Sequence, residues 1–290
     1  MSEAPVDSRG GAGLPESPAP LGSVPGTWTQ AILMSRYQLR DYLRSRRFIL
    51  MMVIVAVIAA LLSAAVLYFR PADLIDSSFA FFGTFWVGGA EVLIVFAGII
   101  FGGDAIAGEF QNKTGYFLMG LPIKRWSVYA GKYLAAFAAS LVTIAVYFVF
   151  IIGFGAYFLG TGVVTLALFE SLALALLYLA ALLGTTFLFS SLFKTSLYGV
   201  LVVAVLFLFG FTIVIALVEG LAHIEPWFVV TYANAVIAYP FGSIPAHIGR
   251  GMLGSTVYNP TYPEGILIML GYFLGTTLGG LLLFEREEFT

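Results

Sequence analysis

The chain has 290 residues, of which 60% are hydrophobic and 10% are charged, and its formal net charge is -2. Ordinary soluble domains carry roughly 25% charged residues, so this composition excludes a water-soluble fold for most of the chain. Cysteine is absent, which excludes a disulfide framework, a thiolate metal site and a cysteine nucleophile. We therefore expect an integral membrane protein.

Residues 1–26 contain five prolines among Gly, Ser and Ala and offer almost nothing that could form a core. This composition predicts a disordered cytoplasmic tail. The acidic opening MSEAPVDSRG lacks the basic start and short apolar run of a cleavable signal peptide, so we expect the first apolar span to be retained.

Residues 27–47 have a helical period and are expected to form an amphipathic helix at the membrane surface. An apolar stripe that includes Trp28, Ile32 and Leu43 would enter the headgroup region. The stripe beside it would meet anionic lipid and consists of Arg36, Arg40, Arg44 and Arg47. Alternatively, these arginines only keep this end of the chain in the cytoplasm.

Six apolar stretches follow, each long enough to cross about 30 Å of hydrocarbon at 1.5 Å per residue. They predict an all-α membrane fold with six transmembrane helices over residues 48–290. The expected spans are residues 48–69, 79–103, 133–159, 163–193, 196–218 and 265–284.

The basic residues predict the orientation, because Lys and Arg are retained on the cytoplasmic side of inserted helices. With both termini inside the cell, 12 of the 14 basic residues lie in the cytoplasm, and only Arg70 and Arg250 lie outside. We therefore expect a multi-pass protein of the cell membrane.

The connection between the second and third spans, residues 103–133, is the longest cytoplasmic one and is expected to have its own structure. Glu109 and Lys113 stand four residues apart, as in a helical ion pair, and Pro122 ends that helix. A second short helix is expected to start at Lys124 and Arg125 and to continue into the third span.

In this connection the sequence resembles the type-2 ABC transporter permeases, which are membrane subunits found mainly in exporters. The resemblance rests on an ordered set of positions: Asp104, Glu109, Thr114, Leu121 with Pro122, Lys124 or Arg125, and Gly131 with Lys132. Tyr116 and Phe117 depart from the pattern, because aliphatic residues are more common there.

The resemblance implies a cytoplasmic coupling helix that contacts a separate ATPase subunit, which would bind ATP and Mg²⁺. It also implies two copies of the permease and no cofactor or enzymatic activity in this chain. No GxxxxGK[ST] motif occurs, which agrees with an ATPase in another chain. The coupling residues would be Asp104, Glu109, Lys113, Thr114, Leu121, Pro122, Lys124, Arg125 and Lys132.

Charged and ionisable residues in or near the spans are candidates for the translocation path or its gate. Glu91 lies near the centre of the second span, where a charged carboxylate costs at least about 2.5 kcal/mol, so it should face the bundle interior or a wet cavity, or remain protonated. Glu170 lies nearer the outer end of the fourth span. Both histidines, His223 and His247, lie in the outer connection.

The outer connection, residues 219–264, is too long for a simple turn, and its apolar, aromatic centre at residues 226–241 is expected to fold back on the membrane as a re-entrant or interfacial segment before the last span. Such a segment would form a lid over the exit. Its Glu and His residues have irregular spacing, so no metal site is predicted, and interfacial histidines that bind water account for them as well.

Glycines recur every fourth residue in two spans and are expected to be helix packing faces, either within one subunit or between two. They are Gly98 and Gly102 in the second span and Gly271, Gly275 and Gly279 in the last.

Two other functions are compatible with a six-span protein: an intramembrane enzyme that uses Glu91 as an acid or base, and a passive channel or scaffold. The absence of HExxH and GxSxG motifs disfavours the enzyme, and the coupling loop disfavours the channel. We expect the lipid bilayer, but no nucleic acid, among the partners. The transported substrate does not follow from the sequence.

Overall fold

The computed structural model describes residues 26–69, 77–112, 123–242, 247–250 and 256–286. Six of its helices are long and apolar enough to cross a membrane. They are Arg46–Phe69, Ser78–Gln111, Arg125–Leu159, Leu166–Leu192, Ser196–Ala222 and Tyr262–Arg286. Each overlaps one of the six expected stretches, so the six-helix architecture is confirmed. The expected disordered tail lies outside the described residues, except for Gly26.

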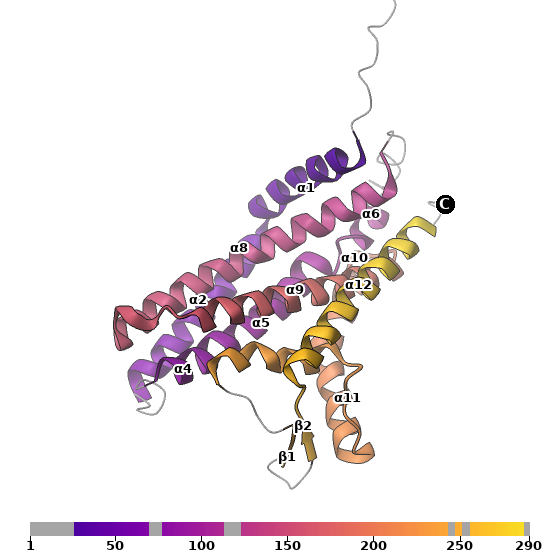
Figure 1. Cartoon of the computed structure of the whole chain (residues 1–290). Helices are drawn as coiled ribbons and strands as arrows, with labels where there is room; N and C mark the ends of the chain where they lie inside the picture. The colour runs from indigo at the N-terminus through magenta and orange to yellow at the C-terminus, as the bar shows by residue number, and fades with distance from the viewer. Residues whose placement is uncertain (1–25, 70–76, 113–122, 243–246, 251–255, 287–290) are drawn as a thin grey trace, which may run out of the picture.

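Four spans are single helices, and two are assembled from shorter ones (Figure 1). The single helices are α2 (Arg46–Phe69), α8 (Arg125–Leu159), α9 (Leu166–Leu192) and α12 (Tyr262–Arg286). A single 3₁₀ turn, Thr161–Val163, connects α8 to α9.

The second and fifth spans are interrupted by π-helical turns, which widen the helix locally. The second span consists of α4 (Ser78–Phe81), a π turn (Phe82–Trp86), α5 (Val87–Ala97), a π turn (Gly98–Gly102) and α6 (Ala107–Gln111). The fifth consists of α10 (Ser196–Val205), a π turn (Leu206–Gly210), α11 (Phe211–Leu217) and a π turn (Val218–Ala222).

The third span begins at Arg125 rather than at Tyr133. No proline follows Pro122 before the span, so the short second helix expected in this connection is the N-terminal part of α8. The first part of the connection is α6, and the expected break between them, residues 113–122, lies outside the described residues.

The amphipathic helix is α1 (Thr27–Arg44), which lies along α8 on the same side of the bundle as the C-terminal end of α12 (Figure 1). Gly131 of α8 permits this contact, because a Cβ built there would lie 2.7 Å from the Cβ of Met34. The indole rings of Trp28 and Trp126 also meet, with centroids 4.8 Å apart.

One side of α1 therefore packs on protein, which the sequence did not predict. Ala31 and Tyr42 are buried, whereas Trp28 and Ile32 remain exposed. The basic residues Arg36, Arg40 and Arg44 are also exposed.

The outer connection returns into the bundle after the fifth span. Its centre is the 3₁₀ helix η6 (Val230–Phe241), which packs against α9 and α12 and is largely buried. The hydroxyl of Ser171 on α9 donates a 2.7 Å hydrogen bond to the carbonyl of Ile237, and Trp86 donates through Nε1 to Ser171 Oγ at 2.9 Å. These bonds connect η6 to the second and fourth spans.

A two-stranded antiparallel hairpin follows η6 and is an exception to the all-α prediction. Its strands are β1 (Ile248–Arg250) and β2 (Thr256–Tyr258), with Gly249 opposite Val257. The hairpin lies at the opposite end of the molecule from α1 (Figure 1).

The glycine repeats behave differently in the two spans. A Cβ at Gly98 or Gly102 would lie 2.1 Å from Leu182 or Thr186 of α9, so this repeat is a packing face. Nothing lies within 4 Å of a Cβ built at Gly271 or Gly275, so the face of the last span that carries these two glycines has no close neighbour among the described residues. The last span instead meets α9 through Gly184 and Gly280.

Candidate functional site

Charged side chains gather at the end of the bundle that carries α1 and α6, which we call the inner end. Asp104 lies in the turn between the second π turn and α6 and is only 6% exposed. Its two carboxylate oxygens accept hydrogen bonds from the two terminal nitrogens of Arg47, both at 2.6 Å. This bidentate geometry is the strong form of the ion pair. It ties the beginning of the first span to the inner end of the second.

A second ion pair connects α6 to α8. Lys132 is 3% exposed, and its Nζ lies 2.5 Å from Oε1 of Glu109. The same Nζ donates a 3.1 Å hydrogen bond to the carbonyl of Ala105. Glu109 was expected to pair with Lys113, which lies outside the described residues. The structure gives Glu109 a partner on another helix, which helical spacing could not reveal.

The two ion pairs form one group, the inner cluster, which consists of Arg47, Asp104, Glu109 and Lys132. The cluster lines a polar cavity of about 160 Å³ together with Tyr42. The hydroxyl of Tyr42 donates to the carbonyl of Phe101 at 3.1 Å. Burial, and then the nearby carboxylate of Asp104, raise the pKa of Tyr42 well above its usual value, so the hydroxyl remains a donor.

The turn that carries Asp104 is also held by α9. The hydroxyl of Ser190, which is fully buried, accepts hydrogen bonds from the backbone N–H groups of Ile106 and Ala107, both at 3.1 Å. Backbone donors that would otherwise be orphaned at the start of α6 are thereby satisfied. Four of the six spans therefore meet at the inner cluster and the turn beside it.

Side chains also fix both ends of the undescribed segment 113–122. Before it, Oε1 of Gln111 accepts a 2.8 Å hydrogen bond from the backbone N–H of Ser196 at the start of α10. After it, Arg125 donates a 2.7 Å hydrogen bond to the carbonyl of Glu285 in α12. Lys124 is exposed between these anchors. The remaining predicted coupling residues, Lys113, Thr114, Leu121 and Pro122, lie outside the described residues.

A second polar site lies within the membrane-spanning part. Glu91 of α5 is partly buried, and its Oε1 accepts a 2.5 Å hydrogen bond from Nδ2 of Asn234 in η6. Glu91 opens on a cavity of about 140 Å³ that is also lined by Phe207 and Leu208 of the fifth span. Glu170 is exposed on α9, so it does not share the polar environment of Glu91.

Tyr178 of α9 adds an unusual feature to this site. It is fully buried near Glu91 and Asn234, and its hydroxyl makes no hydrogen bond of standard geometry to any described residue. The sequence singled out Glu91 but neither of these two neighbours. The sequence feature that could have indicated Asn234 is its position as a polar residue in an otherwise apolar segment.

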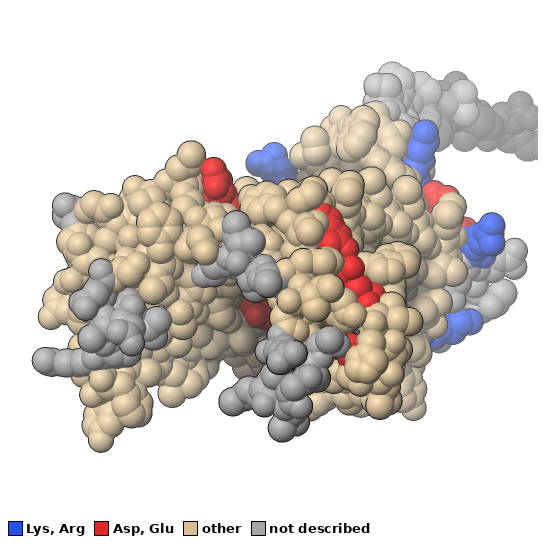
Figure 2. All heavy atoms as spheres, turned by 60° about the horizontal axis from the view of Figure 1, so that its bottom comes forward, with Lys and Arg blue, Asp and Glu red and all other residues tan. Residues whose placement is uncertain are grey.

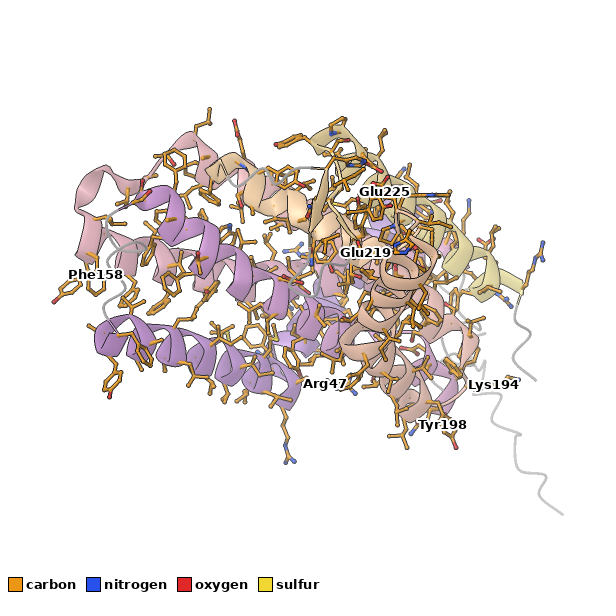
Figure 3. All side chains as sticks on the ribbon, turned by 90° about the horizontal axis from the view of Figure 1, so that it is seen from below. Arg47, Phe158, Lys194, Tyr198, Glu219 and Glu225 are labelled. Atoms are coloured by element: carbon orange, nitrogen blue, oxygen red, sulfur yellow. The ribbon has the colours of Figure 1, made fainter. Side chains whose placement is uncertain are left out.

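Acidic side chains gather at the opposite end, the outer end, on the face that comes forward in Figure 2. Glu219 accepts a 3.2 Å hydrogen bond from the N–H of Tyr258, whose hydroxyl donates to the carbonyl of His223 at 2.8 Å. Figure 3 labels Glu219 and Glu225, which lie on either side of His223 in the sequence. The two hydrogen bonds of Tyr258 attach the hairpin to the end of the fifth span.

Glu225, His247 and Glu264 meet beside the hairpin, although their irregular spacing in the sequence predicted no metal site. One ligand atom from each lies within 4.8 Å of the others. Oε1 of Glu225 accepts a 2.5 Å hydrogen bond from the hydroxyl of Tyr232, and its Oε2 lies 3.6 Å from Nε2 of His247. Burial and the adjacent Glu225 carboxylate raise the pKa of Tyr232, so this hydroxyl also stays protonated.

The family of this membrane protein follows from a comparison with known protein families. The family model described as "ABC-2 family transporter protein" matches residues 34–289, which is most of the chain. The chain belongs to the ABC-2 transporter family. No curated protein matches it.

The ABC-2 family assignment confirms the resemblance seen in the sequence. The chain is a multi-pass membrane permease of a family that lacks an ATPase domain of its own, and membership in this family implies an ATPase partner. The family assignment favours the permease over the intramembrane enzyme and the passive channel.

Proposed function

We propose that this ABC-2 permease exports its substrate by alternating access, driven by an ATPase subunit that binds ATP and Mg²⁺ and contacts the connection between the second and third spans at the cytoplasmic face. The observation that supports this most directly is the inner cluster. Its ion pairs join both ends of that connection to the first three spans, so a force applied to the connection reaches several spans at once.

The docking surface in this proposal is the exposed part of the connection. Asp104 and Lys132 are buried and Glu109 is partly buried, all three in intrachain ion pairs, so their role is to hold the base of the connection. Lys124 is exposed and would contact the ATPase directly, together with the predicted coupling residues Lys113, Thr114, Leu121 and Pro122. Arg125 would transmit the movement to α12 through Glu285.

The test is a charge reversal at the docking surface. Purified Lys124→Glu with Arg125→Glu should lose most of the co-purifying ATPase and of the substrate-stimulated hydrolysis. The matched control is Arg40→Glu, an exposed basic residue on α1 that we assign to the lipid surface together with Arg36 and Arg44. If the double reversal retains the ATPase and transport, or if Arg40→Glu removes the ATPase equally, the docking proposal is wrong.

We also propose that the Glu91 site lies on the translocation path and that two copies of the permease enclose that path. Glu91, Asn234 and Tyr178 come from three separate elements and bring their polar groups together at a depth where polar groups are costly. The fifth span lines the adjoining cavity, yet only 11% of its most apolar stretch is buried within one chain. A second copy would cover part of this span.

Two substitutions of Glu91 test the path. Glu91→Gln retains an oxygen that can accept from Asn234 and should fold normally, but it should change substrate-stimulated ATPase activity and transport. Glu91→Leu should abolish transport while the ATPase remains bound. Wild-type transport in both variants would show that Glu91 does not lie on the translocation path. Full activity of a monomeric permease in nanodiscs would show that a second copy is not needed.

A further inference from the structure

Three ligand-type side chains converge at the outer end from segments that are far apart in the sequence. Glu225 follows the fifth span, His247 immediately precedes β1, and Glu264 lies in the first turn of α12. Their ligand atoms lie within 4.8 Å of one another, and all three residues have some access to solvent. We call these three residues the outer site.

The hairpin fixes the orientation of the histidine ring. Nδ1 of His247 lies 2.7 Å from the carbonyl oxygen of Asn259, and the backbone N–H of Asn259 donates to the carbonyl of His247 at 2.9 Å. A carbonyl can only accept, so Nδ1 carries the proton and Nε2 is directed toward Glu225. Histidines that bind metals almost always donate their other ring N–H to such a carbonyl or carboxylate.

Both carboxylates are positioned by bonds of their own. The hydroxyl of Tyr232 donates a hydrogen bond to Oε1 of Glu225, and Oε2 faces the imidazole of His247. Oε2 of Glu264 accepts from the backbone N–H and the hydroxyl of Thr261, at 3.1 Å and 3.3 Å, so the side chain is held against the start of α12. In metal sites the ligating carboxylates are commonly held in the same way by hydrogen bonds from residues that do not touch the ion.

The spacing of the ligand atoms suits a small divalent ion. Two donors that each lie 2.0–2.1 Å from a tetrahedral zinc ion are about 3.4 Å apart. Nε2 of His247 and Oε2 of Glu225 are 3.6 Å apart, so little adjustment is needed for this pair. One imidazole and two carboxylates favour zinc over Mg²⁺ or Ca²⁺, which require more oxygen ligands.

We propose that Glu225, His247 and Glu264 bind a divalent transition-metal ion, with zinc as the best match, at the outer end of the permease. Bound zinc would join the segment after the fifth span, the hairpin and the start of the sixth span. It would therefore hold together the parts of the outer connection that precede and follow η6. The sequence predicted no metal site, because its residues are brought together only by the hairpin and by the return of η6 into the bundle.

The test is zinc binding by the full-length permease in nanodiscs, after any affinity tag has been cleaved, since the chain has only two histidines. Isothermal titration should give one zinc ion per chain, zinc should raise the melting temperature, and Co²⁺ should give the visible absorption of a tetrahedral site. His247→Gln should weaken zinc binding at least about tenfold, because even loss of a hydrogen-bond partner of a metal ligand costs 10–100-fold.

Two further variants test whether zinc binds at the outer site rather than elsewhere on the chain. Glu225→Gln should weaken zinc binding as His247→Gln does, whereas His223→Gln, which changes the other histidine, should bind zinc like wild type. The proposal is overturned if wild type binds no zinc, if His247→Gln binds it equally well, or if His223→Gln loses it to the same extent. None of these measurements depends on the ATPase, so the result stands apart from the proposed transport function.

Discussion

The inner and outer ends of the helix bundle both gather charges from distant segments, but they balance them differently. In the inner cluster each carboxylate faces a cation: Asp104 faces Arg47, and Glu109 faces Lys132. At the outer end two carboxylates share His247 among the described residues. The inner cluster therefore balances its own charge, whereas the outer site has more carboxylates than cations and would be stabilised by a bound cation.

The largest expected effect concerns the ion pair between Glu109 and Lys132 in the inner cluster. Glu109→Gln leaves the buried Lys132 ammonium without its carboxylate, which should destabilise the protein by about 3 kcal/mol. Thermal unfolding in nanodiscs measures the loss. A second substitution, Lys132→Met, should restore most of the stability, because a buried ion pair can be replaced by apolar groups. A Glu109→Gln variant as stable as wild type would show that the pair contributes little.

The next effect concerns how α1 joins the inner end. Gly131→Ala places a methyl group 2.7 Å from the Cβ of Met34 and 2.9 Å from the carbonyl oxygen of Ala31. This overpacking should cost about 1–3 kcal/mol and separate α1 from α8. Gly153→Ala is the matched control on the same helix, because nothing lies within 4 Å of its added Cβ. Equal melting temperatures for the two variants would contradict the close packing.

At the outer end, Tyr232→Phe should remove the hydrogen bond to Glu225. A hydrogen bond to a charged group contributes about 1.5–3 kcal/mol, and the lower value applies here because Glu225 is partly exposed. Melting in a chelator measures this loss, and zinc titration of the same variant should show weaker binding. Unchanged zinc affinity would indicate that Tyr232 does not orient Glu225.

The smallest effect concerns the capping role of Glu264. Its carboxylate accepts from the N–H of Thr261, the residue before α12, in the geometry of a capping box. In a chelator, Glu264→Ala should cost about 1 kcal/mol, and Glu264→Gln, which retains an acceptor, should cost less. If both variants melt alike, the carboxylate has no capping role and its position depends on other contacts.

The six spans could be predicted because span length and apolar character are local properties of the sequence. The ion pairs could not be predicted to the same extent. Glu109 and Lys113 have helical spacing, but the buried partner of Glu109 is Lys132 on another helix. Arg47 was assigned to the lipid surface, yet it pairs with Asp104. The periodicity of residues within one helix carries no information about the contacts between helices.

The outer connection shows the same limit. Its apolar centre was predicted to fold back, and η6 is buried against α9 and α12. Its contact with Glu91 through Asn234 was not predictable, because it depends on the depth at which η6 lies. The outer site required the hairpin, which brings His247 close to Glu225 and Glu264, and no pattern in the sequence indicated those strands.

The unbroken course of α8 has a mechanical consequence. Its 35 residues contain no proline, and at 1.5 Å per residue they extend about 50 Å, well beyond about 30 Å of hydrocarbon. The excess length projects at the Arg125 end, where α1 is attached. A tilt of about 5° around its inner end would displace Leu159 by about 4 Å, so α8 can act as a lever that carries a small movement across the whole bilayer.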